Sequence, residues 1–183
     1  MKKIVLFMCA FFAASCVFAQ RIASGKNISG SKKIVVYYSL TETTARLAEN
    51  IASECGADLF RLECKVPYST GMGEAGRESK ADKENGVHRE LLAVPDLSSY
   101  DVVFVGTPVW SSGAANPVET WLLLADLHGK KVVPFCTYWS TGKNETLNEI
   151  AKLSSGAEIL EGIGQAHSQS VDVSSWLKKI GLK

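Results

Sequence analysis

The sequence predicts an α/β fold in which a doubly wound, five-stranded parallel sheet lies between two layers of helices. Segments rich in β-branched residues alternate along the chain with segments of helical periodicity. The connections between them are short, which favours right-handed crossovers and a parallel sheet. The strongest strand segments are apolar on both faces, as helix-covered strands must be. The 183 residues, 46% of them hydrophobic, suit one domain, which we place at residues 33–183.

The first strand is predicted at Lys33–Ser39, where β-branched and aromatic residues are dense. A helix follows directly, because alanine, leucine and isoleucine recur at helical spacing over residues 40–55. Gly56 suits the end of that helix. Residues 57–64 then alternate apolar and polar, which is typical of a strand near the edge of a sheet.

The middle of the chain contains one polar segment followed by a second strand and helix unit. Residues 65–96 are rich in polar residues and glycine, with a helix predicted from about Glu74 to Leu92. Asp101–Thr107 is predicted as a buried strand. Pro117–Leu127 is predicted as an apolar helix that starts at a proline, where a missing N–H costs nothing.

The same alternation continues to the C-terminus. A strand is predicted at Lys130–Cys136, a helix at Asn144–Leu153, a fifth strand at Ala157–Gly162 and an amphipathic helix at Val171–Ile180. In such sheets, ligands bind beyond the carboxyl ends of the strands, where the strand order reverses. The loops after the first, third and fourth strands are therefore the candidates for a site.

The N-terminus has the layout of a secretory signal peptide over residues 1–19. Two lysines precede an apolar run at 4–14, and small residues follow, with cleavage favoured after Ala19. Lipid attachment at Cys16 is the weaker alternative, since the residues before it fit a lipobox poorly. Residues 20–32 are polar and rich in glycine and serine, which predicts a flexible leader. We expect an exported, periplasmic or cell-envelope protein with no membrane span in the mature chain.

Charge and cysteine content exclude several other classes. Without Lys2 and Lys3 the 20 basic residues become 18 against 19 acidic ones, so neither nucleic acid nor an anionic membrane is an expected partner. Cys55, Cys64 and Cys136 follow the signal, an odd number that does not indicate a disulfide framework. No pattern of catalytic triad, paired carboxylates or metal-spaced histidines is present, so no catalytic or metal-binding residue is assigned.

The first candidate loop joins a strand to the N-terminus of a helix, where backbone N–H groups are free to bind an anion. Ser39, Thr41, Thr43 and Thr44 add hydroxyl groups there, so a phosphate monoester can be held without a basic side chain. The alternative is that Thr41 or Thr43 simply caps the helix.

The other two candidate loops contribute aromatic side chains. Residues 106–113 carry Trp110, which either stacks on a ring system or closes the core beneath the loop. Residues 135–142 carry Tyr138 and Trp139. Hydroxyl groups beside aromatic walls predict a ligand with a phosphate and a planar heterocycle. FMN fits better than a dinucleotide, because no G-x-G-x-x-G motif is present.

Three segments in order resemble the flavodoxin family, in particular short-chain bacterial members with YYSLTGNT, YD…GxPxW and PFxT motifs. They are YYSLTETT at 37–44, YDVVFVGTPVW at 100–110 and GKKVVPFCT at 129–137. The resemblance implies strand order 2-1-3-4-5, FMN phosphate on the first loop and the isoalloxazine ring between the other two. The predicted FMN-binding residues are Ser39, Thr41, Glu42, Thr43, Thr44, Pro108, Val109, Trp110, Ser111, Thr137, Tyr138, Trp139 and Gly142.

This chain departs from the family pattern at two places. Glu42-Thr43 stands where Gly-Asn is usual, and the Glu42 carboxylate must face solvent or it will repel the phosphate. Tyr138-Trp139-Ser140 stands where Gly-Gly-Ser is usual, so Trp139 is either an extra stacking wall or a plug.

Three functions remain open at this point. The protein is an FMN electron carrier, an FMN-dependent NAD(P)H or quinone reductase, or a binding module on the same scaffold that has lost FMN. A redox partner protein or a small-molecule acceptor is expected, and the oligomeric state is left open. The near-neutral charge weakens the carrier relative to the reductase, because carriers of this family are often strongly acidic.

Overall fold

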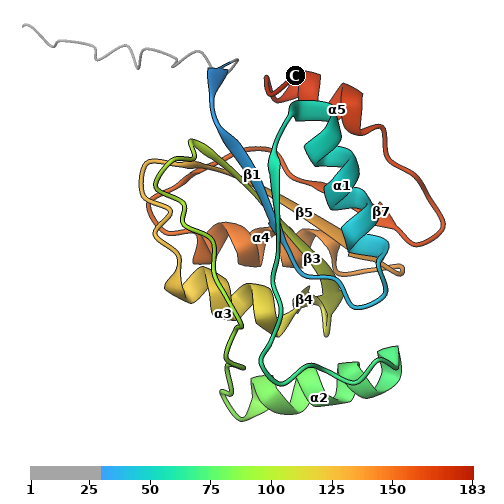
Figure 1. Ribbon diagram of the computed structural model, residues 1–183. Helices are drawn as coiled ribbons and strands as arrows, with labels where there is room; N and C mark the ends of the chain where they lie inside the picture. The colour runs from blue at the N-terminus through green and yellow to red at the C-terminus, as the bar shows by residue number, and fades with distance from the viewer. Residues whose placement is uncertain (1–29) are drawn as a thin grey trace, which may run out of the picture.

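The computed structural model describes residues 30–183. The predicted signal peptide at 1–19 and most of the predicted leader at 20–32 lie outside the described residues. In the part that is described, two layers of helices enclose one sheet, as the sequence predicts (Figure 1).

The sheet runs in the order β2-β1-β3-β5-β6, and all of these pairings are parallel. β7 also pairs with β5 in parallel, while β4 forms a short antiparallel arm on β3. Without this arm, β5 is the fourth strand and β6 the fifth, so the expected order 2-1-3-4-5 is confirmed. The strands are β1 (Lys33–Tyr37), β2 (Asp58–Arg61), β3 (Val102–Trp110), β4 (Gly113–Ala114), β5 (Lys131–Tyr138), β6 (Glu158–Ile159) and β7 (Ile163–Ala166).

Helices cover both faces of the sheet. The helices are α1 (Thr43–Cys55), α2 (Met72–Glu84), α3 (Asn116–Leu124), α4 (Lys143–Leu153) and α5 (Val173–Lys179). Figure 1 shows α1 and α5 on one side of the sheet and α3 and α4 on the other, with α2 below them beyond the end of the sheet near β4. α2 packs mainly on α3, which leaves it beside the carboxyl ends of the strands.

Side chains of β1 alternate between two separate cores, as the period of a strand requires. Ile34 and Val36 pack beneath α3 and α4, in a core that includes the fully buried Trp121. Val35 and Tyr37 pack on the opposite side with α1 and α5. Burial on both faces explains why this strand reads as a continuous apolar run.

The predicted fifth strand at 157–162 is wrong in its extent. It is split into β6 and β7, which pair with successive parts of β5. The Leu160 N–H donates to the Val132 carbonyl, and the next bond of the ladder would require an N–H at position 134. Residue 134 is proline, which has no such donor, so the pairing breaks there and resumes at Ile163.

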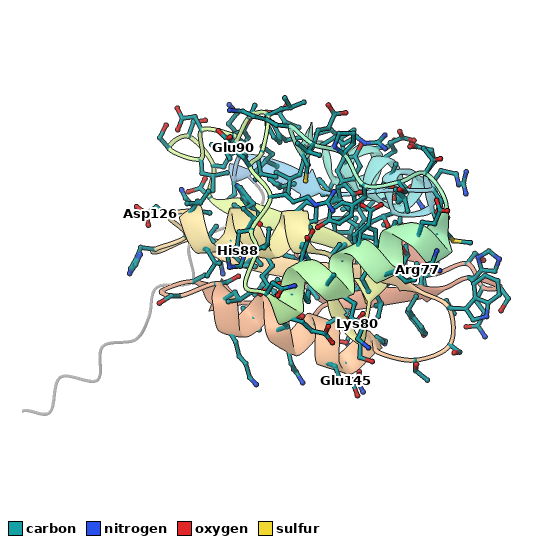
Figure 2. The ribbon with its side chains drawn as sticks, turned by 90° about the horizontal axis from the view of Figure 1, so that it is seen from below. Arg77, Lys80, His88, Glu90, Asp126 and Glu145 are labelled. Atoms are coloured by element: carbon teal, nitrogen blue, oxygen red, sulfur yellow. The ribbon has the colours of Figure 1, made fainter. Side chains whose placement is uncertain are left out.

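The predicted helix from Glu74 to Leu92 is also wrong in its extent, since α2 ends at Glu84. Gly86 takes a positive φ of 64°, and the chain then turns back. Arg89 donates to Asp82 at 2.7 Å, which fixes the returning segment against the helix it has left. Leu91 pairs with Cys64 in an isolated bridge. Figure 2 labels His88 and Glu90 on this returning segment and Arg77 and Lys80 on α2.

Candidate functional site

The N-terminus of α1 has no side-chain cap. Its N-cap residue is Glu42, in the left-handed region at φ 62°, and neither Thr41 nor Thr43 caps the helix. Their hydroxyl oxygens lie 3.5 Å apart. Capping by Thr41 or Thr43 is therefore wrong, and the N–H groups of Thr43 and Thr44 remain available to an anion.

The Glu42 carboxylate is held by Arg61, at the end of β2. Two nitrogens of the guanidinium donate to it, at 2.6 and 3.0 Å, and one of them also donates to the Ser39 carbonyl at 2.8 Å. Hydrogen bonding from Arg61 lowers the pKa of Glu42, so the carboxylate stays charged. Its charge is balanced on the β2 side of the loop, and about half of its surface faces solvent.

Ser39 and Thr44 lie in the interior of the first loop. The Ser39 hydroxyl accepts the Ala45 N–H at 3.2 Å, which holds the turn into α1. Thr44 is 1% exposed, and its hydroxyl lies 2.7 Å from that of Thr137 on β5. Both hydroxyls therefore fix the loop to its surroundings, whereas Thr41 and Thr43 lie at its outer side.

One pocket of about 300 Å³ brings the three predicted loops together. It is lined by Leu40, Thr41, Thr43, Met72, Gly76, Pro108, Val109, Trp110, Ser111, Thr137, Tyr138, Trp139 and His167. Of the predicted binding residues, Ser39, Glu42, Thr44 and Gly142 do not line it. Sequence reasoning missed Leu40, Met72, Gly76 and His167.

Trp110 is half-buried, so it packs on the core beneath the loop and is also open to the pocket. Its ring packs edge-on against Tyr38 at 5.4 Å and against Tyr68 at 5.1 Å. It also forms part of the pocket wall. The two tyrosines therefore fix the orientation of this side chain.

Gly142 supports the pocket wall from behind. A Cβ atom there would lie 2.6 Å from Cγ1 of Val109 and 3.3 Å from Cα of Ser112. Gly142 also has a φ of 88°, which side chains disfavour. The residue thus allows the turn after β5 to approach the turn after β3, where Ser111 and Ser112 both have positive φ.

Trp139 forms an outer wall of the pocket. It is 69% exposed and stacks on His167 with ring centroids 4.1 Å apart and an interplanar angle of 20°. This position favours the wall over the plug. His167 follows β7, and it was missed because the sequence places the last strand several residues too early. Pro134, where the pairing with β5 breaks, was the signal in the sequence that could have placed the last strand later and His167 just after it.

Cys136 lies at this edge of the sheet but is fully buried. Burial raises the pKa of its thiol to about 12, so the group stays protonated and unreactive. Across residues 30–183, no cluster of potential metal ligands is found. Within the same residues, none of the helices combines the length and apolar character needed to cross a bilayer.

Comparison with solved structures identifies similar folds. A protein from Bacteroides eggerthii assigned as a flavoprotein is 27% identical, with a TM-score of 0.73 over 84% of this chain and 99% of its own. A flavoprotein from Lactobacillus acidophilus, solved in complex with FMN, is 20% identical, with a TM-score of 0.69 over 82% and 98%. A WrbA-like flavodoxin from Agrobacterium tumefaciens is 18% identical, with a TM-score of 0.56 over 82% and 95%.

A search of curated protein sequences gives no significant match. The family model described as Flavodoxin matches residues 32–180, which is nearly all of the part that folds around the pocket. The chain therefore belongs to the flavodoxin family.

Proposed function

We propose that this protein binds FMN non-covalently in the pocket and serves as an electron carrier. The observation that carries the proposal is the pair of free N–H groups of Thr43 and Thr44, at the start of α1 beside an aromatic-lined pocket. The donor set fits a phosphate monoester, since it offers free N–H groups and the hydroxyls of Thr41 and Thr43. Membership of the family and the FMN complex of the Lactobacillus acidophilus flavoprotein support the same cofactor.

Each part of the pocket has a distinct task in this proposal. The first loop binds the phosphate, with Ser39 and Thr44 keeping its shape. Trp110, Tyr138 and Trp139 flank the ring system and limit the access of water to it. FMN supplies the redox chemistry, and the protein sets the polarity around the ring.

Replacing Thr43 with valine is expected to weaken FMN binding about fivefold, because one hydrogen bond to a charged group is lost. Binding of riboflavin, which has no phosphate, is expected to stay unchanged. The measurement is quenching of flavin fluorescence on titration with the apoprotein. Thr70→Val, at an exposed threonine outside the pocket, is the matched control. Equal weakening for both flavins would contradict phosphate binding at this loop.

An NAD(P)H- or quinone-dependent reductase is the second candidate. Met72 and Gly76 of α2, together with Trp139 and His167, extend the pocket beyond the predicted loops and leave room for a substrate. The near-neutral charge also favours this candidate. Steady oxidation of NAD(P)H with a quinone would support the reductase, whereas reduction only by a partner protein would support the carrier.

The third candidate, a module without FMN, is the weakest. It would be favoured if the Glu42 carboxylate occupied the N-terminus of α1, but that carboxylate is paired with Arg61. A purified protein without flavin absorbance, and without affinity for added FMN, would establish this candidate instead.

The proposal also includes export from the cytoplasm, which rests on the lysines and the apolar run in residues 1–19. We expect the mature chain to begin at Gln20. N-terminal sequencing of protein from the periplasmic or envelope fraction tests this. A chain beginning at a lipid-modified Cys16 would point to the anchored form.

A further inference from the structure

A second pocket of about 420 Å³ lies on the other side of Leu40 from the first. It is lined by Tyr38, Ser39, Leu40, Arg61, Leu62, Glu63, Cys64, Lys65, Pro67, Tyr68 and Leu92. Its outer wall comes from the segment that leads from β2 down towards α2 (Figure 1). The two pockets share Leu40, and Trp110 of the first contacts Tyr38 and Tyr68 of the second.

Tyr38 gives this pocket a hydrogen-bond donor that no described residue uses. The side chain is only 7% exposed, yet its hydroxyl has no hydrogen-bond partner in the described part of the chain. Burial raises the pKa of Tyr38 to about 12, so the hydroxyl keeps its proton. The hydroxyl oxygen itself is not among the buried side-chain atoms that lack a partner, so it is accessible to a molecule in the pocket that it lines.

Three charged side chains line the pocket, and two of them have ion-pair partners. Arg61 is bound by Glu42, and Lys65 pairs with Glu90. The third, Glu63, is exposed and has no ion pair among the described residues. Most of the other lining residues are apolar or aromatic, with Leu62 and Tyr68 buried and Leu92 more than half exposed. Cys64 is buried, and burial raises the pKa of its thiol, so it adds no charge.

We propose that this second pocket binds a small, neutral, flat molecule whose carbonyl oxygen accepts a hydrogen bond from the Tyr38 hydroxyl. A pocket whose walls are mostly apolar or aromatic, with a few placed polar groups, is the usual form of a site for such a ligand. A molecule bound here is separated from the first pocket by Leu40 and Trp110. This position suits a small-molecule redox partner, but the binding itself does not require FMN.

The proposal is tested by titrating the full-length apoprotein with duroquinone, followed by calorimetry and by the amide NMR shifts of residues 38–40 and 62–65. The ring of this quinone is fully substituted, so the Cys64 thiol has no open ring position to attack. Tyr38→Phe removes only the hydroxyl oxygen and is expected to weaken binding about fivefold. Tyr100→Phe is the matched control, because its hydroxyl bonds to Asp58 outside both pockets.

Two further measurements separate this site from the first. Leu92→Trp narrows the mouth at an exposed position, so it is expected to weaken duroquinone binding without affecting FMN. Saturation with FMN is expected to leave duroquinone binding in place. Undetectable binding at millimolar duroquinone, equal affinity of wild type and Tyr38→Phe, or competition between duroquinone and FMN would each overturn the proposal. None of these results would change the outcome of FMN titration alone, which tests the proposed function.

Discussion

Replacing Gly106 with alanine is expected to lower the free energy of unfolding by about 3 kcal/mol, because the added methyl group has no room between the strands. A Cβ atom there would lie 2.0 Å from Cζ of Phe135 and 2.5 Å from one of its Cε atoms. Gly106 and Phe135 are neighbours on β3 and β5, and Phe135 is fully buried. Because β3 and β5 lie in the interior of the sheet, neither strand can move apart without disturbing both cores.

Urea denaturation, compared at constant m-value, measures this loss of stability. Gly73→Ala is the matched control, since its nearest neighbour would be a nitrogen of Arg77 at 3.8 Å. That change is expected to stabilise α2 by up to about 1 kcal/mol through helix propensity. Adding Phe135→Leu to Gly106→Ala should restore part of the lost stability. A midpoint for Gly106→Ala equal to that of the wild type would show that the sheet adjusts freely.

The strands that form the centre of the sheet could be predicted because their side chains are apolar on both faces. β1, β3 and β5 each contain two adjacent valines with isoleucine or phenylalanine close by. The weaker elements depend on tertiary contacts. The split between β6 and β7 depends on Pro134 in a neighbouring strand, and the end of α2 is fixed by Gly86 and the ion pair of Arg89.

Most of the candidate site could be predicted because it follows the carboxyl ends of strands, whose relative positions are set by the fold class. The contribution of α2 could not be predicted in the same way. α2 is placed by contacts between distant segments, including the pairing of Lys83 with Glu119 and Glu149 and the bond from Ser79 to Asn116. The sequence shows these residues but not that they meet.

The sequence did not show that Arg61 binds Glu42, although it did show that the Glu42 carboxylate could repel a phosphate. The two residues are 19 positions apart, and they meet because β2 pairs with β1 in parallel. Arg61 thereby balances the carboxylate of the N-cap residue of α1, close to the helix end where a phosphate would bind. It also fixes the Ser39 carbonyl, so the same side chain orders the loop.

Replacing Arg61 with alanine is expected to weaken FMN binding about tenfold to thirtyfold, because the freed Glu42 carboxylate then repels the phosphate. Glu42→Gly is expected to tighten binding relative to wild type, since it removes the charge and suits the positive φ at that position. Fluorescence titration with FMN measures both effects. Lys179→Ala, at an exposed lysine paired with Glu161, is the control for loss of one surface cation.

The double variant Glu42→Gly/Arg61→Ala decides how Arg61 acts. If Arg61 acts by balancing Glu42, removing the carboxylate makes the arginine dispensable, and the double variant binds FMN nearly as well as Glu42→Gly alone. The effect of Arg61→Ala should also shrink at high salt, because both side chains are partly exposed. A double variant as weak as Arg61→Ala would instead mean that the guanidinium acts on the phosphate or the loop directly. In that case phosphate binding by the first loop would depend on a basic side chain.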